Sequence, residues 1–226
     1  MAQIFHPSAN TLAKASIFGA LLVIGALMWI AYELTRSPYI TQAYVPREQP
    51  VQFSHEHHVG GLGIDCRYCH TSVTESYFAG IPNTKTCMTC HSQIWTNADL
   101  LAPVRASWRT GEPIAWTRVH DLGDFAHFPH DVHVNRGVSC VSCHGQVNEM
   151  PLMWKTESLR MQWCLDCHRD PAPHLRPREE VFNMAWHPDN DPEKYKGRST
   201  IEIGRDLMEK YKINTYQLTN CSICHY

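Results

Sequence analysis

One long uncharged segment stands out in a chain whose other apolar residues are short and scattered. Residues 15–32 (ASIFGALLVIGALMWIAY) contain no charged side chain. As an α-helix these 18 residues measure about 27 Å, close to the hydrocarbon thickness of a bilayer. Lys14 and Glu33 flank the segment, and Trp29 and Tyr32 occupy positions typical of the aromatic belt at a membrane interface. The pattern predicts a transmembrane helix.

A cleaved signal peptide is the competing interpretation of the same segment. No Ala-x-Ala cleavage site follows the apolar run. We therefore expect an uncleaved single-span anchor. Residues 1–36 would form the cytoplasmic N-terminus and the transmembrane helix, and residues 37–226 would form one domain on the far side of the membrane.

Two segments between the anchor and residue 111 have readable patterns, one extended and one helical. Residues 37–52 hold three prolines, which predict an extended linker. Residues 96–110 predict a short helix, with Thr96 or Asn97 as its cap and Gly111 just past its end.

Three further segments follow between the anchor and the C-terminus. Residues 112–127 are mixed in character and we expect them to be irregular. Residues 170–177 (DPAPHLRP) predict a rigid non-helical strap, because proline removes helical hydrogen bonds. Residues 199–211 (STIEIGRDLMEKY) predict an amphipathic helix. Its expected inward-facing residues are Ile201, Leu207, Met208 and Tyr211.

Composition excludes one class of partner and leaves the cysteines as the informative residues. The chain is 43% hydrophobic and 19% charged, with a formal net charge of −2. No basic run and no alternation of basic with aromatic residues is present, so nucleic acid is not expected as a partner.

The sequence Cys-x-x-Cys-His occurs five times and uses all ten cysteines. This is the attachment signature of c-type haem. On one helical turn the two thiols share a face and reach the porphyrin, while the adjacent histidine ligates the iron as its proximal ligand. Zinc sites and disulfides need no histidine directly after the second cysteine, so both are poor explanations of five such motifs. In chain order, motifs 1 to 5 are Cys66, Cys69 and His70; Cys87, Cys90 and His91; Cys140, Cys143 and His144; Cys164, Cys167 and His168; and Cys221, Cys224 and His225.

The motifs predict five covalently bound haem c groups and a multihaem cytochrome c fold. We expect mostly irregular structure with short α-helices packed on haems, and one N-terminal transmembrane helix. Too little apolar protein surface remains for the chain to fold without haem. Haem c is attached outside the cytoplasm, so we expect residues 37–226 to face the periplasm or cell exterior, and the anchor to lie in the cytoplasmic membrane.

An internal duplication accompanies the first four motifs. Phe53-x-His55-x-x-His58 precedes motif 1, and Phe128-x-His130-x-x-His133 precedes motif 3. The repeats span 53–91 and 128–168, and a C-terminal haem unit spans 199–226. Two histidines three residues apart on a helical turn project in similar directions, so each can serve a different haem as distal ligand.

This arrangement resembles the small multihaem cytochromes of the c3/c7 type. The resemblance implies that the first histidine of each pair ligates the haem of the next motif. His55 would then serve motif 1 and His130 motif 3, while His58 and His133 would serve haems of motifs further along.

The fifth distal ligand is less determined. We expect it to be His120, with His187, His174, His127 or a methionine as alternatives. The methionines in question are Met150, Met153, Met161 and Met184, and a Met/His haem would have a higher potential than a bis-His haem.

Three segments together resemble the pentahaem cytochrome c subunit of alternative complex III, over nearly the whole chain. They are residues 116–125 (WTRVHDLGDF), 143–150 (CHGQVNEM) and 161–169 (MQWCLDCHR). The resemblance implies an electron-transfer subunit, not itself an enzyme, within a quinol-oxidising respiratory or photosynthetic complex. It implies as partners an integral-membrane quinol-binding subunit, an iron–sulfur subunit, another haem c subunit, and a periplasmic electron carrier or terminal oxidase.

A stand-alone membrane-anchored multihaem quinol dehydrogenase, feeding a periplasmic reductase, is the alternative. It also carries one N-terminal span, but the duplicated Phe-x-His-x-x-His and the distance of Cys66 from the membrane exit near Arg36 argue against it. A membrane-tethered electron store without obligate partners is a third possibility.

Overall fold

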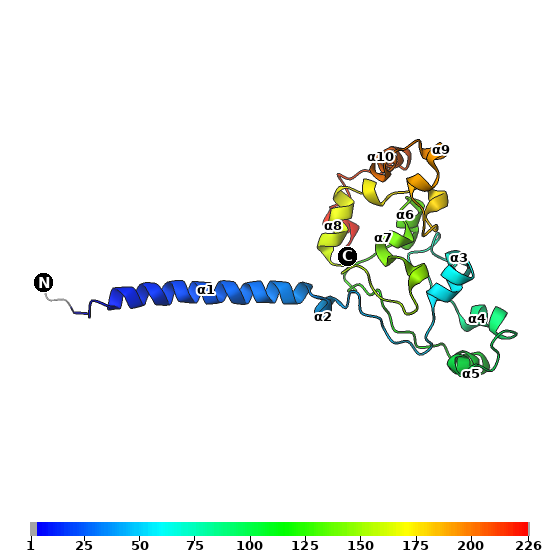
Figure 1. Ribbon diagram of the computed structural model, residues 1–226, viewed down its shortest axis with the longest axis horizontal. Coiled ribbons are helices and arrows are strands. Elements are labelled where there is room, and N and C mark those ends of the chain that lie inside the picture. Colours follow the sequence, from blue (N-terminus) through cyan, green and yellow to red (C-terminus); the bar gives the residue numbers. More distant parts are fainter. Residues whose placement is uncertain (1–3, 226) are drawn as a thin grey trace. The chain divides into compact units, whose positions relative to one another are not determined.

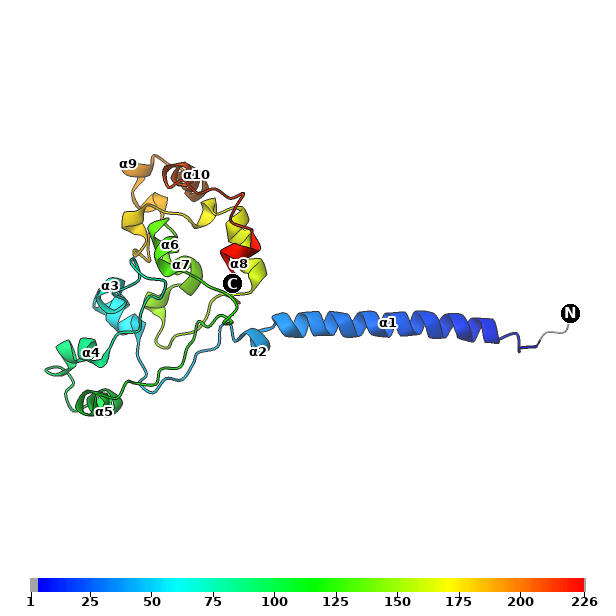
Figure 2. The same ribbon diagram turned by 180° about the vertical axis from the view of Figure 1, so that it is seen from behind.

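The computed structural model describes residues 4–225. The chain divides into two units, Met1–Ala43 and Tyr44–Tyr226, which are described separately. Figures 1 and 2 show the ribbon from opposite sides. All ten cysteines and every histidine except His6 belong to the second unit. The chemistry predicted from the sequence therefore lies in that unit alone.

The first unit consists of helix α1, Ala9–Arg36, and the short helix α2, Pro38–Thr41. Helix α1 is longer than the predicted 15–32 and has no buried residue within the unit. Its most apolar 18-residue window has a mean hydropathy of 2.1, so it is long and apolar enough to cross a membrane. A signal sequence would have the same length and composition.

The prediction of an extended linker over 37–52 is wrong at its start, where α2 forms. Pro38 occupies the first turn of α2, where the missing N–H would have no helical partner and the fixed φ suits the helix. Gln42 ends α2 in the left-handed region with φ 57°. Residues 44–52 contain no helix.

The second unit is built from short helical segments joined by irregular chain (Figure 1). Named strands are absent from residues 4–225, and the second unit contains isolated bridges such as Ala126↔His225 and Val138↔Leu175. This agrees with the predicted fold class. The α-helices are α3 Cys66–Cys69, α4 Thr84–His91, α5 Ala102–Thr110, α6 His130–Asn135, α7 Cys140–His144, α8 Met161–Arg169, α9 Pro192–Tyr195 and α10 Thr200–Lys210. One π-helix, η1 Glu56–Gly61, and six 3₁₀ segments complete the unit: η2 Asp99–Leu101, η3 Val147–Glu149, η4 Ala172–His174, η5 Arg178–Glu180, η6 Pro188–Asn190 and η7 Cys221–Ile223.

The buried apolar side chains form three small clusters rather than one core. The largest joins Leu175, Trp186, Tyr195, Ile203, Leu207 and Tyr211. The others are Val51, Leu101 and Val104, and Val73, Val134 and Val181. Clusters this small supply little hydrophobic stabilisation for a unit of this length, as expected for a chain whose interior is completed by bound porphyrin.

Helix α10 confirms the predicted amphipathic helix but corrects its inward face. Ser199 and Glu202 form a capping box that fixes its start. Ile203 and Leu207 are buried, whereas Ile201 is 46% exposed and not inward as predicted. Leu207 and Tyr211 are buried and Met208 packs against their cluster, as predicted, so the prediction is wrong only at Ile201. Gly204 packs directly on the backbone of η4, which brings the adjacent Ile203 to the interior instead.

Two further predictions need correction. The helix expected over 96–110 forms as η2 followed by α5, and Gly111 ends it in the left-handed region with φ 77°, as predicted. Neither Thr96 nor Asn97 caps it, because the residue before η2 is Ala98. The 170–177 strap is not wholly non-helical, since η4 forms within it after Pro171. Residues 112–127 contain no helix, as predicted.

Candidate haem-binding sites

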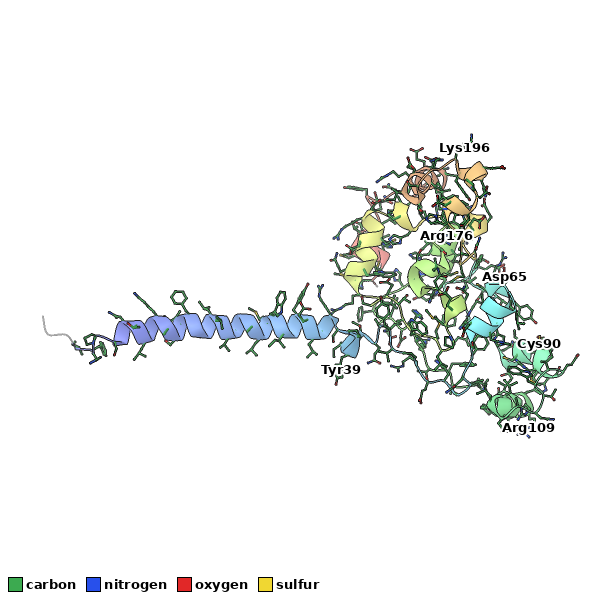
Figure 3. The ribbon with its side chains drawn as sticks, in the orientation of Figure 1. Tyr39, Asp65, Cys90, Arg109, Arg176 and Lys196 are labelled. Atoms are coloured by element: carbon green, nitrogen blue, oxygen red, sulfur yellow. The ribbon has the colours of Figure 1, made fainter. Side chains whose placement is uncertain are left out.

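Each Cys-x-x-Cys-His motif lies wholly or partly on a helical segment. In motifs 1 and 3 the polar residue just before the first cysteine caps the turn: Asp65 accepts from the Arg67 backbone N–H, and Ser139 from that of Val141. Figure 3 shows Asp65 at the start of α3, and Cys90 on α4, where it is exposed. Cysteines three residues apart on such a turn lie on the same face, as attachment of one porphyrin requires.

The ring nitrogen Nδ1 of most candidate ligands is already engaged by the backbone. Four of the five motif histidines place Nδ1 against a carbonyl oxygen: His70 on Gly80 at 2.7 Å, His91 on Ile94 at 3.1 Å, His168 on Leu218 at 2.8 Å and His225 on Phe125 at 3.1 Å. An Nδ1–H that donates to a carbonyl fixes the tautomer and leaves Nε2 as the metal-binding atom.

The paired histidines of the two repeats show the same device. Nδ1 of His58 lies 2.8 Å from the Ser54 carbonyl, and Nδ1 of His133 lies 2.8 Å from the Pro129 carbonyl, four residues earlier in both cases. Nδ1 of His130 lies 3.1 Å from the carbonyl oxygen of Tyr77. These rings therefore also direct Nε2 away from the backbone.

Three histidines of the repeats face a motif histidine across a nearly constant gap. The ring centroids are 6.2 Å apart for His58 and His91, 6.4 Å for His130 and His144, and 6.1 Å for His133 and His168. Two imidazoles that bind one metal ion at about 2 Å from each nitrogen have centroids roughly 6 Å apart. The three pairs thus have the spacing of axial ligands to one iron.

The duplication seen in the sequence is repeated in the packing of its phenylalanines. Phe53 stacks on His58 with centroids 4.4 Å apart and meets His55 edge-on at 4.8 Å. Phe128 stacks on His133 at 4.3 Å and meets His130 edge-on at 4.9 Å. One aromatic ring thus supports both histidines of each pair. The repeated Phe-x-His-x-x-His spacing marks this phenylalanine in the sequence, but only the structure shows what it contacts.

Burial lowers the pKa of the paired histidines of both repeats and of His144, which favours the neutral imidazole that binds a metal. Burial, followed by the charges of His70 and His58, lowers the pKa of His55 to about 4. Burial is also the largest cause of the lowered pKa of His130 and of His144. Nδ1 of His55 is buried and makes no hydrogen bond within the protein. The pairing of His55 with the motif 1 histidine, His70, is supported by the effect of the His70 charge on the pKa of His55, which requires the two rings to be near each other.

His120 does not occupy a position like those of the facing pairs. Its Nε2 lies 3.2 Å from Nδ1 of His144, and the two rings meet edge-on with centroids 4.2 Å apart. It therefore adjoins a motif histidine that already faces His130. This contact, between residues 24 apart, has no signal in the sequence.

The other candidates for the fifth distal ligand lie elsewhere. Nδ1 of exposed His187 lies 3.4 Å from the backbone nitrogen of Asp189 and 3.2 Å from a carboxylate oxygen of the same residue. His174 ends η4. The backbone N–H of His127 donates to the Cys224 carbonyl, beside motif 5. The ring stacked on His225 is Phe125, with centroids 5.9 Å apart.

The five motifs lie in an unbroken succession that differs from their order in the chain. Motif 2 adjoins motif 1, because the hydroxyls of Tyr68 and Thr89, one from each motif, are 2.8 Å apart. Motif 4 adjoins motif 5, because His168 Nδ1 bonds the Leu218 carbonyl, three residues before Cys221. In both views of the ribbon, α4, α3, α7 and α8 follow one another in that order (Figures 1 and 2).

The cysteine thiols link the central motifs in the same order. The hydrogen bond between the Cys66 and Cys140 thiols, and then burial, raises the pKa of Cys140 far above its usual range, so motif 1 meets motif 3. Burial, followed by the charges of Cys167 and Cys164, raises the pKa of Cys143 to about 12, so motif 4 lies close to motif 3. The succession is therefore motif 2, 1, 3, 4 and 5.

Comparison with known proteins agrees with this geometry. Residues 33–109, which contain motifs 1 and 2, match the class III cytochrome C family. The chain is 28% identical over 183 residues to a protein of Nitratidesulfovibrio vulgaris strain Hildenborough named menaquinone reductase, multiheme cytochrome c subunit. The match covers 80% of this chain and 70% of that protein.

The fold is that of a multihaem cytochrome c.

The side chains of the second unit fit the prosthetic group that the family match implies. Thiol pairs lie on single turns, and imidazoles face one another at 6.1–6.4 Å with Nδ1 turned to the protein. Groups of three or more metal-binding side chains converging on one point were not found in residues 4–225. The donor set is thus arranged in pairs, the pattern that axial ligation of haem iron uses. Electron transfer, and not catalysis by the chain itself, is the activity that such a cytochrome supports.

Proposed function

We propose that this cytochrome is a membrane-anchored pentahaem relay that carries electrons within a quinone-linked respiratory or photosynthetic complex. The observation that supports the relay best is the succession of motifs 2, 1, 3, 4 and 5, in which each motif adjoins the next. Haem c, once bound, supplies one-electron chemistry. Electrons can pass from one end of the domain to the other only if each haem lies next to another haem, and adjacent motifs would provide that arrangement.

The chain's own residues attach, orient and insulate the prosthetic groups. The ten motif cysteines would attach the porphyrins, and the five motif histidines would provide proximal ligands. His55, His58, His130 and His133 would provide distal ligands to motifs 1, 2, 3 and 4, as the facing pairs support for the last three. Phe53 and Phe128 hold both members of each distal pair in place.

The membrane attachment belongs to the same proposal. Helix α1 would be a single uncleaved span, with the residues before it in the cytoplasm and residues 37–226 on the periplasmic or extracellular side of the cytoplasmic membrane. Haem c attachment outside the cytoplasm is the physical reason for this orientation.

We propose that electrons enter from a partner that oxidises quinol and leave to a periplasmic carrier or terminal oxidase. The partners would be an integral-membrane quinol-binding subunit, an iron–sulfur subunit and another haem c subunit. The relative from Nitratidesulfovibrio vulgaris carries the name of a menaquinone reductase subunit, which supports quinone-linked transfer in the opposite direction as the second candidate. Reduction of the haems by a quinol analogue in the intact complex, compared with quinone reduction by a reduced carrier, decides the direction.

The relay order is tested by interrupting it in the middle. Replacing Cys140 and Cys143 by alanine removes the motif 3 haem, which leaves motifs 2 and 1 separated from motifs 4 and 5. Replacing Cys221 and Cys224 removes a terminal haem and is the matched control, because the four remaining motifs stay contiguous. In stopped-flow reduction by the partner complex, the first variant should show two rapidly reduced haems of four, and the control four. Rapid reduction of all four haems in both variants would refute the order.

A further inference from the structure

His144 differs from most of the candidate axial histidines. Seven of the nine histidines in the motifs and repeats hold Nδ1 against a backbone carbonyl oxygen. Nδ1 of His144 instead lies 3.2 Å from a ring nitrogen, Nε2 of His120. The position that the main chain fills elsewhere is filled here by a side chain.

The two neighbours of His144 approach it in different ways. His130 lies nearly parallel, at 10° between ring planes and 6.4 Å between centroids, which leaves room for an iron. His120 meets His144 edge-on, at 71° and 4.2 Å, which leaves room only for a direct hydrogen bond. A facing pair for motif 3 is thus complete without His120.

Proton positions follow from this geometry. The motif histidine must offer Nε2 to the iron, so its single proton sits on Nδ1, the atom directed at His120. Nε2 of His120 then accepts that proton's hydrogen bond, and its own proton sits on Nδ1. With Nε2 occupied in this way, His120 does not offer an iron the nitrogen that the other candidate ligands offer.

We propose that His120 is a positioning residue for His144, accepting a hydrogen bond from its Nδ1–H, and is not an axial ligand. The inference rests on the proposed attachment of haem to motif 3, and it replaces the expectation that His120 is the fifth distal ligand. An imidazole nitrogen is a stronger hydrogen-bond acceptor than an amide carbonyl. The hydrogen bond to His120 therefore makes His144 a more electron-rich ligand than the other proximal histidines. A haem bound at motif 3 would have a lower reduction potential as a result.

The test compares His120→Ala and His120→Gln in the full haem-loaded chain, with Glu209→Ala, an exposed position on α10, as a surface control. Haem equivalents are counted, spin states are read by electron paramagnetic resonance, and the five potentials are obtained by optical redox titration. The alanine variant should keep five low-spin haems. One haem should shift about tenfold toward the reduced state, ~59 mV for one electron, the lower end of the effect of losing a partner of a metal-binding histidine.

Glutamine separates positioning from ligation. Its amide oxygen can accept the hydrogen bond at a similar reach, so His120→Gln should restore a potential close to that of the wild type with every haem low-spin. A high-spin haem in the glutamine variant, or loss of a haem from it, would overturn the proposal. Unchanged potentials in the alanine variant would overturn it as well. Fewer than five haems in the wild type would instead count against the proposed function, independently of His120.

Discussion

Phe53 and Phe128 occupy equivalent places in the two repeats, and each touches both histidines of its pair. Replacing either phenylalanine by leucine keeps apolar bulk but removes one stacked and one edge-on contact, at centroid separations of 4.3–4.9 Å. Aromatic pairs of this kind contribute about 1 kcal/mol each beyond the burial of area. A loss of about 1 kcal/mol shifts the equilibrium between bound and released distal histidine about fivefold.

Carbon monoxide binding to the reduced protein measures that equilibrium, because the gas binds iron only when the distal histidine is released. In Phe128→Leu, about two of five haem equivalents should bind carbon monoxide about fivefold faster, namely those ligated by His130 and His133. Phe53→Leu should affect two different haems, and the double variant about four. The two effects should be additive, because the two phenylalanines contact different histidines.

The matched control is Phe182→Leu, which removes a phenylalanine that packs on the Val73 cluster and lies over Arg67 instead of on a candidate ligand. Its carbon monoxide kinetics should equal those of the wild type. Equal kinetics in Phe128→Leu and Phe182→Leu would refute the role assigned to the repeated phenylalanine. So would acceleration of the same two haems by Phe53→Leu and Phe128→Leu.

Three other substitutions give distinct expected results. His133→Ala should turn one haem high-spin, and His133→Met should restore low spin with a raised potential; a fully low-spin alanine variant would remove His133 from the ligand set. Gly204→Ala would place a Cβ against the Ala172 carbonyl oxygen, so we expect a lower Tm from overpacking of about 1–3 kcal/mol, and an unchanged Tm would show that η4 can move. Ser199→Ala should lower the Tm by the equivalent of about 1 kcal/mol. Hydrogen bonds from the Ser199 backbone N–H, and then from its hydroxyl, lower the pKa of Glu202 below 4.5, so the contribution of this carboxylate is complete above that pH and is lost as the pH falls through the lowered pKa. Because the alanine variant keeps the backbone N–H, its Tm difference from the wild type should shrink only in part at pH 3, and a difference that grows as the pH falls would contradict the sign.

Local features of the site were predictable because their residues are neighbours in the chain. Two cysteines and a histidine within five residues occupy one turn, so spacing alone placed all five motifs on helical segments. The Phe-x-His-x-x-His repeat likewise predicted two equivalent histidine pairs. Caps such as Ser199 follow from short-range hydrogen bonding, and so does the end of α5 at Gly111.

Features that depend on distant residues escaped the same reasoning. The contact of His120 with His144 joins residues 24 apart, and that of Cys66 with Cys140 joins different repeats, so no periodicity reports them. On α10, Ile201 was assigned inward in place of Ile203, because the packing of Gly204 on η4 decides which residue of the first turn is buried. A chain with small apolar clusters carries little hydrophobic periodicity from which such tertiary contacts can be inferred.

The succession of motifs has a consequence for how the domain is used. Motifs 2 and 5 each have one neighbouring motif, whereas motifs 1, 3 and 4 each have two. Cys90 and Cys221, which are exposed, belong to those two end motifs. A relay needs its ends within reach of partners and its middle insulated, and exposure is distributed in that way here.

The central claim is that one polypeptide binds five haem c groups at its five motifs. The pyridine haemochrome assay on the purified chain, normalised to polypeptide by amino-acid analysis, tests it most directly. We expect five haem equivalents per chain, and four after loss of the cysteines of any one motif. A value clearly below five for the wild type, or an unchanged value after removal of a motif, would contradict the account.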